Sequence, residues 1–189
     1  QASDFNFALS GGNATLSSAT PTSISISGNV VTLGIGLSGT PNGSESLTVT
    51  PVANSIYDAD GNVAETSQLV TSAVNLNDKL VPTITSTADI PVGNATVAVT
   101  FSESVYNTNG GSGALQASDF AFAIAGGTAT LSSATPTSIS ISGNTYTLGI
   151  GLSGTANGSE TLTITPVANS IYDAGGNAAS THQDRNGVV

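Results

Sequence analysis

The sequence of 189 residues has no cysteine, methionine or tryptophan, and only 7% of its residues are charged. An average soluble domain carries roughly 25% charged residues. The lack of cysteine excludes disulfides and thiolate chemistry, and with a single histidine it excludes the usual zinc sites. No apolar run approaches the ~18 residues of a membrane-spanning helix, so we expect no membrane insertion.

Basic residues are nearly absent. The chain has 2 Lys and Arg residues in total and 12 Asp and Glu residues, which gives a formal net charge of −10. No basic patch can form, so nucleic acid and anionic lipid are excluded as partners. The negative charge instead favours a weak attraction of cations such as Ca²⁺. The polar surface must be built from Ser, Thr, Asn and Gly, and the lack of cysteine is compatible with an extracellular setting.

What the sequence does contain is a long internal repeat. The segment that begins QASDF at Gln1 recurs at Gln116, and the offset of 115 residues holds without a gap over 68 positions, of which 13 differ. A period of this length is too long for a solenoid unit and fits a whole β-sandwich domain. The similarity of the two copies indicates an array that grew by duplication, with adjacent copies of the same repeat as neighbours.

The phase of the repeat predicts the domain boundaries. Residues 81–115 precede the second QASDF, and the first copy has no counterpart of them. We therefore predict an incomplete domain over residues 1–74 that lacks its first strands, a linker over 75–80 and a complete domain over 81–189.

Alternating apolar and hydroxyl residues, separated by Gly, Asn and Pro, predict strands nearly throughout. This pattern is typical of an all-β Greek-key sandwich with about seven strands per complete domain. Gly143-Asn144 predicts a tight hairpin turn. The expected strands of the complete copy are 83–85, 95–101, 120–124, 129–131, 138–142, 145–150, 161–165 and 178–189.

Four segments of the complete copy resemble, in their order and spacing, the bacterial immunoglobulin-like repeats of S-layer proteins and giant cell-surface adhesins. They are VAVTFSESV (97–105), ASDF (117–120), the hairpin at 143–144 and DAGGN (173–177). The resemblance implies tandem immunoglobulin-like sandwiches that form stalks, filaments or adhesins outside the cell. It does not imply one particular ligand.

The best candidate for a binding site is a calcium site at the junction between domains. Hard oxygen ligands from three segments could hold Ca²⁺ there and stiffen the joint. The predicted ligands are Asn77, Asp78, Glu103, Asp173 and Asn177. No other cofactor is expected.

The alternative interpretation of Asp173 and Asn177 is a tight Asx-type turn in which Gly176 adopts a positive φ. Asp4 and Asp119 are expected to cap the turn that enters a strand. Tyr57 and Tyr172 resemble the tyrosine corner of immunoglobulin-like sandwiches. Tyr106 and Tyr146 are expected to be partly exposed. His182 is expected on the surface of a strand, because a lone histidine forms no catalytic constellation.

These observations favour a structural repeat module of an extracellular bacterial surface protein, acting as a stalk spacer or as a filament-forming unit. Strands from a neighbouring molecule could complete the truncated copy by strand addition, which would make the chain part of a homopolymer. The alternative is an adhesive module that binds glycan or another surface, with a calcium-stiffened junction. Ice binding through the Thr-x-Thr rows is a third hypothesis. Without a triad, paired carboxylates or a metal motif, we predict that the chain is not an enzyme.

Overall fold

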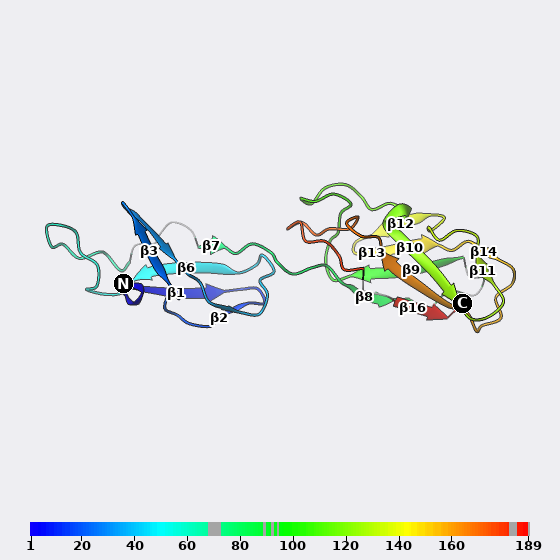
Figure 1. Cartoon of the computed structure of the whole chain (residues 1–189), viewed down its shortest axis with the longest axis horizontal. Coiled ribbons are helices and arrows are strands. Elements are labelled where there is room, and N and C mark those ends of the chain that lie inside the picture. The colour runs from blue at the N-terminus through cyan, green and yellow to red at the C-terminus, as the bar shows by residue number, and fades with distance from the viewer. Residues whose placement is uncertain (68–72, 89, 92, 94, 182–184, 189) are drawn as a thin grey trace. The chain divides into compact units, whose positions relative to one another are not determined.

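The computed structural model describes residues 1–67, 73–88, 90–91, 93, 95–181 and 185–188. These residues form an all-β structure (Figure 1), as the alternating pattern predicted. They divide into two compact units, Gln1–Leu80 and Val81–Val189. The only described helices are two short 3-10 turns, η1 (Ala2–Asp4) and η2 (Ala117–Asp119).

The second unit contains a four-stranded sheet in the order β12-β13-β9-β8 and a three-stranded sheet in the order β10-β15-β16. Strands β11 and β14 form a separate two-stranded sheet. All described pairings are antiparallel. The strands are β8 (Ile84–Thr87), β9 (Thr96–Phe101), β10 (Phe120–Ala125), β11 (Thr130–Leu131), β12 (Ile139–Ser142), β13 (Thr145–Gly149), β14 (Leu152–Ser153), β15 (Thr161–Pro166) and β16 (Arg185–Val188).

The first unit repeats this plan without the first two strands. Its sheets have the orders β1-β6-β7, β2-β5 and β3-β4. Each of β1 to β6 lies 115 residues before its counterpart among β10 to β15, and the pairing registers are the same. The strands are β1 (Phe5–Ser10), β2 (Thr15–Leu16), β3 (Ile24–Ser27), β4 (Val30–Leu33), β5 (Leu37–Ser38), β6 (Ser46–Pro51) and β7 (Val74–Asn75).

The core of the second unit is built by period-two alternation on both main sheets. In β9, Val97, Val99 and Phe101 are at most 2% exposed, while the residues between them are half-buried. The Phe101 ring lies 6.2 Å from the ring of Phe120 and packs edge-on against that of Tyr146 at 5.7 Å. β9 therefore supplies side chains that both sheets pack against.

The core of the first unit is much smaller. Among its described residues, the buried hydrophobic side chains are Phe7, Ala14 and Leu47. In the second unit, the described core cluster has fifteen residues, and six of them come from the segment 81–115 that has no counterpart in the first unit. These six are Ile84, Val97, Val99, Phe101, Val105 and Leu115.

Two local features follow directly from the sequence. Gly143 has a φ of +57° at the first position of the two-residue turn between β12 and β13, where glycine is favoured. The segment predicted as a linker hydrogen-bonds to the first unit. In it, Leu76 N–H donates to Glu45 O at 3.0 Å and Lys79 N–H donates to Pro41 O at 2.9 Å.

Candidate functional site

The turn from Asp173 to Asn177 is closed by hydrogen bonds between its two ends. Asp173 Oδ1 accepts the Asn177 N–H and Asp173 Oδ2 accepts the Asn177 side-chain amide, both at 2.8 Å. Asp173 is completely buried, and Gly176 has a φ of +84°. The predicted Asx-type turn with a positive-φ glycine is thus confirmed.

The same turn recurs in the first unit as Asp58 to Asn62. Asp58 Oδ2 accepts the Asn62 side-chain amide at 2.8 Å, and Asp58 Oδ1 accepts the N–H groups of Asp60 and Asn62. The pKa of Asp58 is lowered, chiefly by the hydrogen bond from the Asn62 side chain. Asp58 is exposed, whereas its counterpart Asp173 is buried.

Of the five predicted calcium ligands, the second unit brings two carboxylates together. Glu103 and Asp173 each offer a carboxylate oxygen, and these oxygens lie within 4.8 Å of each other. Asn177 adjoins them through its bonds to Asp173. Asn77 and Asp78 belong to the first unit, where Asn77 is exposed and Asp78 Oδ1 accepts the Leu80 N–H at 2.8 Å.

A buried carboxylate that sequence reasoning missed holds two loops of the second unit. Glu160 is 0% exposed. Its Oε1 accepts the N–H groups of Thr128 at 2.7 Å and Ala129 at 3.0 Å, and its Oε2 accepts those of Asn157 at 3.0 Å and Gly158 at 3.1 Å. A buried charge is tolerated only when it is well hydrogen-bonded, and these four donors meet that need.

Glu45 does the same in the first unit. It is also 0% exposed, and Oε1 accepts the N–H groups of Asn13 at 2.7 Å and Ala14 at 2.9 Å. Oε2 accepts the Asn42 N–H at 3.0 Å. The two copies therefore share a carboxylate that fastens the loop after the first strand of the QASDF segment to the loop before β6 or β15.

These contacts lower the pKa of both glutamates. The hydrogen bond from the Ala129 N–H has the largest influence on the pKa of Glu160. Together with the other backbone donors it outweighs burial, which acts to raise the pKa, and the pKa is lowered to about 2. For Glu45, burial acts to raise the pKa, but backbone donors led by Ala14 lower it to about 2. Both carboxylates are structural anions that stay ionised through the physiological range.

The sequence did hold a signal for this pair. Each glutamate follows Asn-Gly-Ser, lies directly before a strand, and recurs in both copies of a chain that has few acidic residues. The Gly-Gly pair upstream is its partner. A Cβ on Gly127, whose φ is +56°, would lie 2.0 Å from Glu160 Cδ, so only glycine leaves room for the carboxylate.

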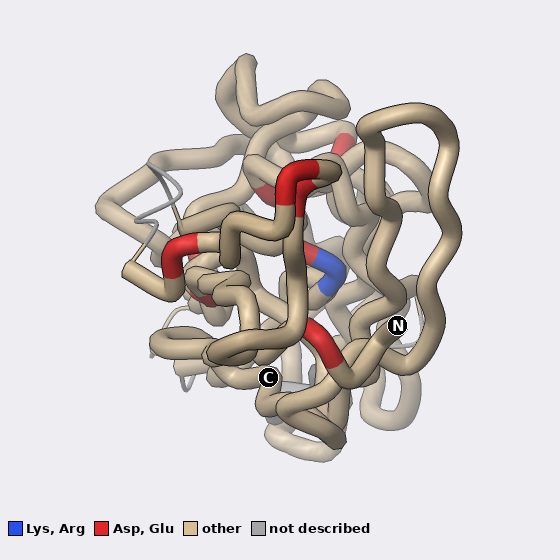
Figure 2. The backbone as a smooth tube through the Cα atoms, turned by 90° about the vertical axis from the view of Figure 1, so that its left-hand side faces the viewer, with Lys and Arg blue, Asp and Glu red and all other residues tan. Residues whose placement is uncertain are grey.

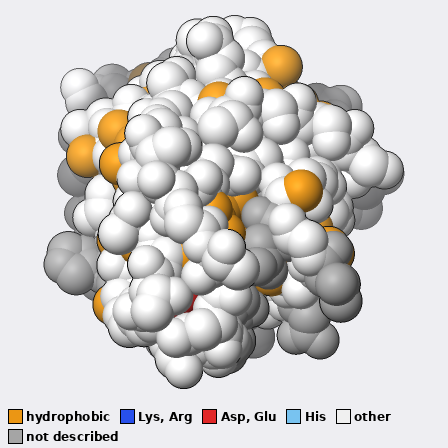
Figure 3. All heavy atoms as spheres, turned by 90° about the vertical axis from the view of Figure 1, so that its right-hand side faces the viewer, with side chains coloured by type: hydrophobic (Ala, Val, Ile, Leu, Met, Phe, Trp, Pro, Cys, Tyr) orange, Lys and Arg blue, Asp and Glu red, His pale blue; other side chains and the backbone are white. Residues whose placement is uncertain are grey.

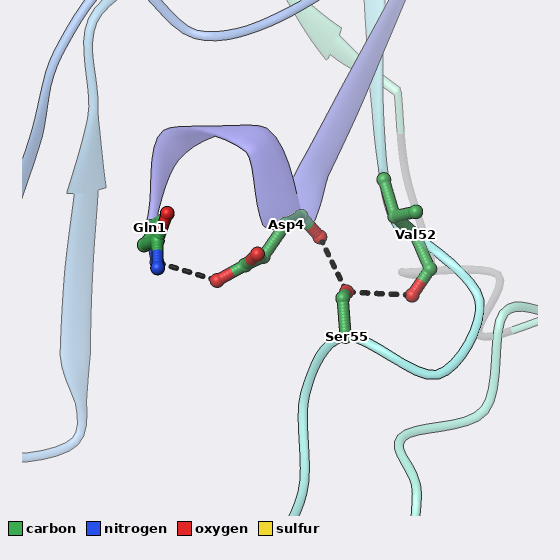
Figure 4. Close-up of polar contacts among 4 residues, drawn as sticks. All are labelled: Gln1, Asp4, Val52 and Ser55. Atoms are coloured by element: carbon green, nitrogen blue, oxygen red, sulfur yellow. Dashed lines mark hydrogen bonds and ion pairs between the residues drawn. The ribbon is translucent and has the colours of Figure 1, made fainter.

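Asp119 caps the turn that enters β10, as predicted. Its Oδ2 accepts the Gln116 N–H at 2.7 Å, and burial raises its pKa against the opposing effect of that hydrogen bond. In the first unit, Asp4 makes the same contact with the Gln1 nitrogen. Figure 4 shows this contact together with the Ser55 hydroxyl, which bridges the carbonyls of Asp4 and Val52.

The tyrosines partly follow the predictions. Tyr172 and Tyr57 donate their hydroxyls to carbonyls three residues upstream, at 2.9 and 3.0 Å, as a tyrosine corner does. The expectation of a partly exposed Tyr146 is wrong. Its ring is 3% exposed because Phe101 packs against it, and its hydroxyl donates to Val105 O. His182 lies outside the described residues.

The largest difference between the units is an open sheet edge at β4. In the second unit β13 pairs with β12 on one side and β9 on the other. In the first unit the counterpart of β13 is β4, and among the described strands it pairs with β3 alone. An unpaired edge of this kind is a template for another strand.

The apolar side chains next to this edge are correspondingly exposed. Val31 and Ile35 are 39% and 40% exposed, whereas their counterparts Tyr146 and Ile150 are 3% and 7% exposed. A groove of about 270 Å³ lies beside Val31. It is lined by apolar Phe5, Ile24, Ile26, Val31 and Ile56 and edged by Gln1, Asp4, Ser55 and Tyr57. We call the β4 edge and these five apolar residues the open face.

Charged residues are sparse along the chain. Figure 2 shows a backbone on which most positions carry neither acidic nor basic residues. On the face in Figure 3, uncharged polar side chains and backbone predominate, and hydrophobic side chains appear in scattered spots. Among the described residues, no helix is long and apolar enough to cross a membrane.

Comparisons of the chain with protein-family models, with curated proteins and with solved structures found no match.

Proposed function

We propose that the chain consists of structural modules from a tandem-repeat array on the surface of a bacterial cell. In this proposal each complete module is an immunoglobulin-like Greek-key sandwich of about seven strands, and the array acts as a stalk spacer or a filament. The family resemblance of the segments at 97–105, 117–120, 143–144 and 173–177 supports the surface setting. We propose no catalytic role.

The observation that carries the proposal is the duplication of contacts between the two units. The buried glutamate, the capping aspartate, the tyrosine corner and the Asp-x-x-Gly-Asn turn each recur at the same offset. Every one of them fixes a loop or a turn of its own unit. Repeated scaffolding of this kind is what an array needs in order to present identical, rigid units.

The proposal predicts that length grows with copy number. Recombinant arrays of two, four and eight complete 115-residue repeats are expected to be extended in negative-stain electron microscopy, with a constant contour increment per added repeat. Arrays that collapse into compact particles, or whose length does not increase with each repeat, would contradict the role as a spacer or filament.

The calcium site remains a prediction, and the closeness of Glu103 and Asp173 is the observation that favours it. Calcium at about 100 times its dissociation constant is expected to stabilise the site by roughly 2.7 kcal/mol, because only the folded state binds it. Thermal melting of the full chain in Ca²⁺ and in EDTA measures this. Glu103→Gln should remove the calcium-dependent rise, whereas Glu65→Gln, at an exposed glutamate, should keep it. Equal melting in both buffers contradicts the site.

The adhesive alternative requires a ligand at the exposed loops. A glycan array probed with the folded chain separates it from the structural proposal. Binding that depends on calcium favours adhesion, and the absence of binding by a fully folded chain favours a spacer.

A further inference from the structure

We propose that Asn109 is a site of spontaneous deamidation, and that the fold makes it the preferred site among the Asn-Gly sequences of the chain. These sequences begin at Asn42, Asn109, Asn157 and Asn186. A glycine after asparagine permits the reaction, because it has no side chain to shield its backbone nitrogen. The same chemistry is open to all four residues, so their surroundings decide which of them reacts.

The reaction uses only the chain and water. The backbone nitrogen of Gly110 attacks Cγ of Asn109 and loses its proton, while the side-chain nitrogen of Asn109 takes up a proton and leaves as ammonia. The bond between Cγ and the Gly110 nitrogen closes a succinimide ring. Water then opens the ring at either carbonyl and leaves aspartate or isoaspartate. The site thereby gains a carboxylate in place of a neutral amide.

Asn109 lies at the tip of a loop in the second unit. The Thr108 N–H donates to Ser112 O at 3.3 Å and closes this loop. Asn109 and Gly110 are exposed, and neither the Asn109 side-chain amide nor the Gly110 N–H has a hydrogen-bond partner among the described residues. A Cβ built on Gly110 would meet no atom within 4 Å. The attacking nitrogen is therefore free, and water has room to reach the ring.

Asn157 is also exposed, but hydrogen bonds hold its reacting groups. Its Oδ1 accepts the Ser159 N–H at 3.0 Å. The nitrogen that would attack belongs to Gly158, and its N–H donates to Glu160 Oε2 at 3.1 Å. With a pKa of about 2, this carboxylate is too weak a base to take the proton. Reaction at Asn157 must therefore break these bonds first.

The other two sequences are held as well. In the first unit, Asn42 Oδ1 accepts the Ser44 N–H at 3.1 Å, and the Asn42 N–H donates to Glu45 Oε2 at 3.0 Å. Asn186 lies within β16, opposite Thr163 of β15. Pairing keeps this backbone extended, and ring closure requires it to turn out of the ladder. Of the four sites, Asn109 is the one at which no described hydrogen bond has to break.

The new carboxylate would form against the turn that Asp173 closes. A Cβ built on Gly176 would lie 2.4 Å from Asn109 Oδ1. A Cβ built on Gly111 would lie 3.1 Å from Ala174 Cα. The tip of the loop therefore packs on this turn. Because charged residues make up only 7% of the chain, the added charge changes the surface of the second unit at a defined place.

Peptide mapping of the full, folded chain during incubation at mildly alkaline pH tests the proposal. Mass spectrometry follows the exchange of the side-chain NH₂ for OH at each site, and electron-transfer fragmentation separates aspartate from isoaspartate. We expect Asn109 to react on the order of 10-fold faster than Asn157, because reaction at Asn157 must break a hydrogen bond to a charged acceptor. Equal rates, or a faster reaction at Asn157, would overturn the proposal.

The unfolded chain separates the effect of the fold from that of the local sequence. In guanidinium chloride the hydrogen bonds to Glu160 are lost, so Asn109 and Asn157 are expected to react at similar rates. A preference for Asn109 that persists undiminished in the unfolded chain would contradict the role of the fold.

Two asparagines of the same loop provide a matched pair of variants. Asn109→Ser should remove the early acidic species that anion-exchange chromatography resolves during the incubation. Asn107→Ser, at a residue followed by threonine, should retain it. An early acidic species that survives in Asn109→Ser, or disappears in Asn107→Ser while the second unit stays folded, would also overturn the proposal.

Discussion

Truncation of Leu148 to alanine is expected to destabilise the second unit by about 2–5 kcal/mol, the range for a buried leucine. Leu148 is 0% exposed, in the middle of a sheet with neighbours on both sides. The same substitution at Leu33, its counterpart in β4, is expected to cost less than about 1 kcal/mol, because no described strand covers that edge and the side chain is half-buried. Denaturant unfolding, followed by NMR signals assigned to each unit, measures both changes.

The comparison is controlled by the repeat itself. Leu33 and Leu148 share the sequence Thr-Leu-Gly-Ile, the same hairpin partner and the same register with it. Their surroundings differ in the segment 81–115, which supplies β9 beside Leu148, and in Val31, which stands in the place of Tyr146. Equal losses of unfolding free energy at the two positions would mean that Leu33 is packed as tightly as Leu148. The exposure of the open face would then have no effect on stability.

Replacement of Glu160 by glutamine is expected to lower the melting temperature of the second unit strongly. Glutamine keeps the shape of the side chain, but one carboxylate oxygen becomes an amide donor. That donor faces backbone N–H groups, because Oε1 and Oε2 both accept from the backbone. Buried donors are left without acceptors, which costs far more than the loss of an exposed contact.

The same substitution should change the response to acid. The folded-state pKa of Glu160 is about 2, against an ordinary value of 4.5. Stabilisation by its charge is therefore complete above pH 4.5 and is lost as the pH falls toward 2. In Glu160→Gln the second unit should lose this part of its acid sensitivity. The first unit, which keeps Glu45 with a pKa of about 2, should retain its own and serves as the internal control.

Acid titration of Glu160→Gln, with the stability of each unit followed separately by NMR, tests this prediction. An unaltered pH dependence of the second unit in Glu160→Gln would show that its carboxylate does not carry the acid-labile stability. Asp119 cannot produce the same dependence of stability on pH, because burial raises its pKa whereas the pKa of Glu160 is lowered.

Much of the strand pattern could be read from the sequence because alternation reports burial directly. Phe120 and Phe122 are buried on one face of β10 as the period-two pattern predicted. β14 was not predicted, since a strand of two residues, Leu152 and Ser153, has no periodicity to detect. Tyr146 was misplaced because its burial depends on Phe101, a residue on another strand.

The site was harder to predict than the strands. Asp173 and Asn177 gave a local signal, since both partners lie in one turn of five residues. Glu160 gave a weaker signal, because its partners Thr128 and Ala129 are 32 and 31 residues away along the chain. The open face has no motif at all. It follows from comparing the two copies. β13 is paired on both sides, whereas its counterpart β4 is paired with a described strand on one side.

Hydrogen exchange of the unmodified chain tests the central claim, that β4 lacks the strand that covers β13. We expect strong protection for the amides of Tyr146, Leu148 and Ile150, and nearly unprotected exchange for those of Val31 and Leu33, which point away from β3. Protection of Val31 and Leu33 equal to that of Tyr146 and Leu148, in a chain shown to be monomeric, would contradict it.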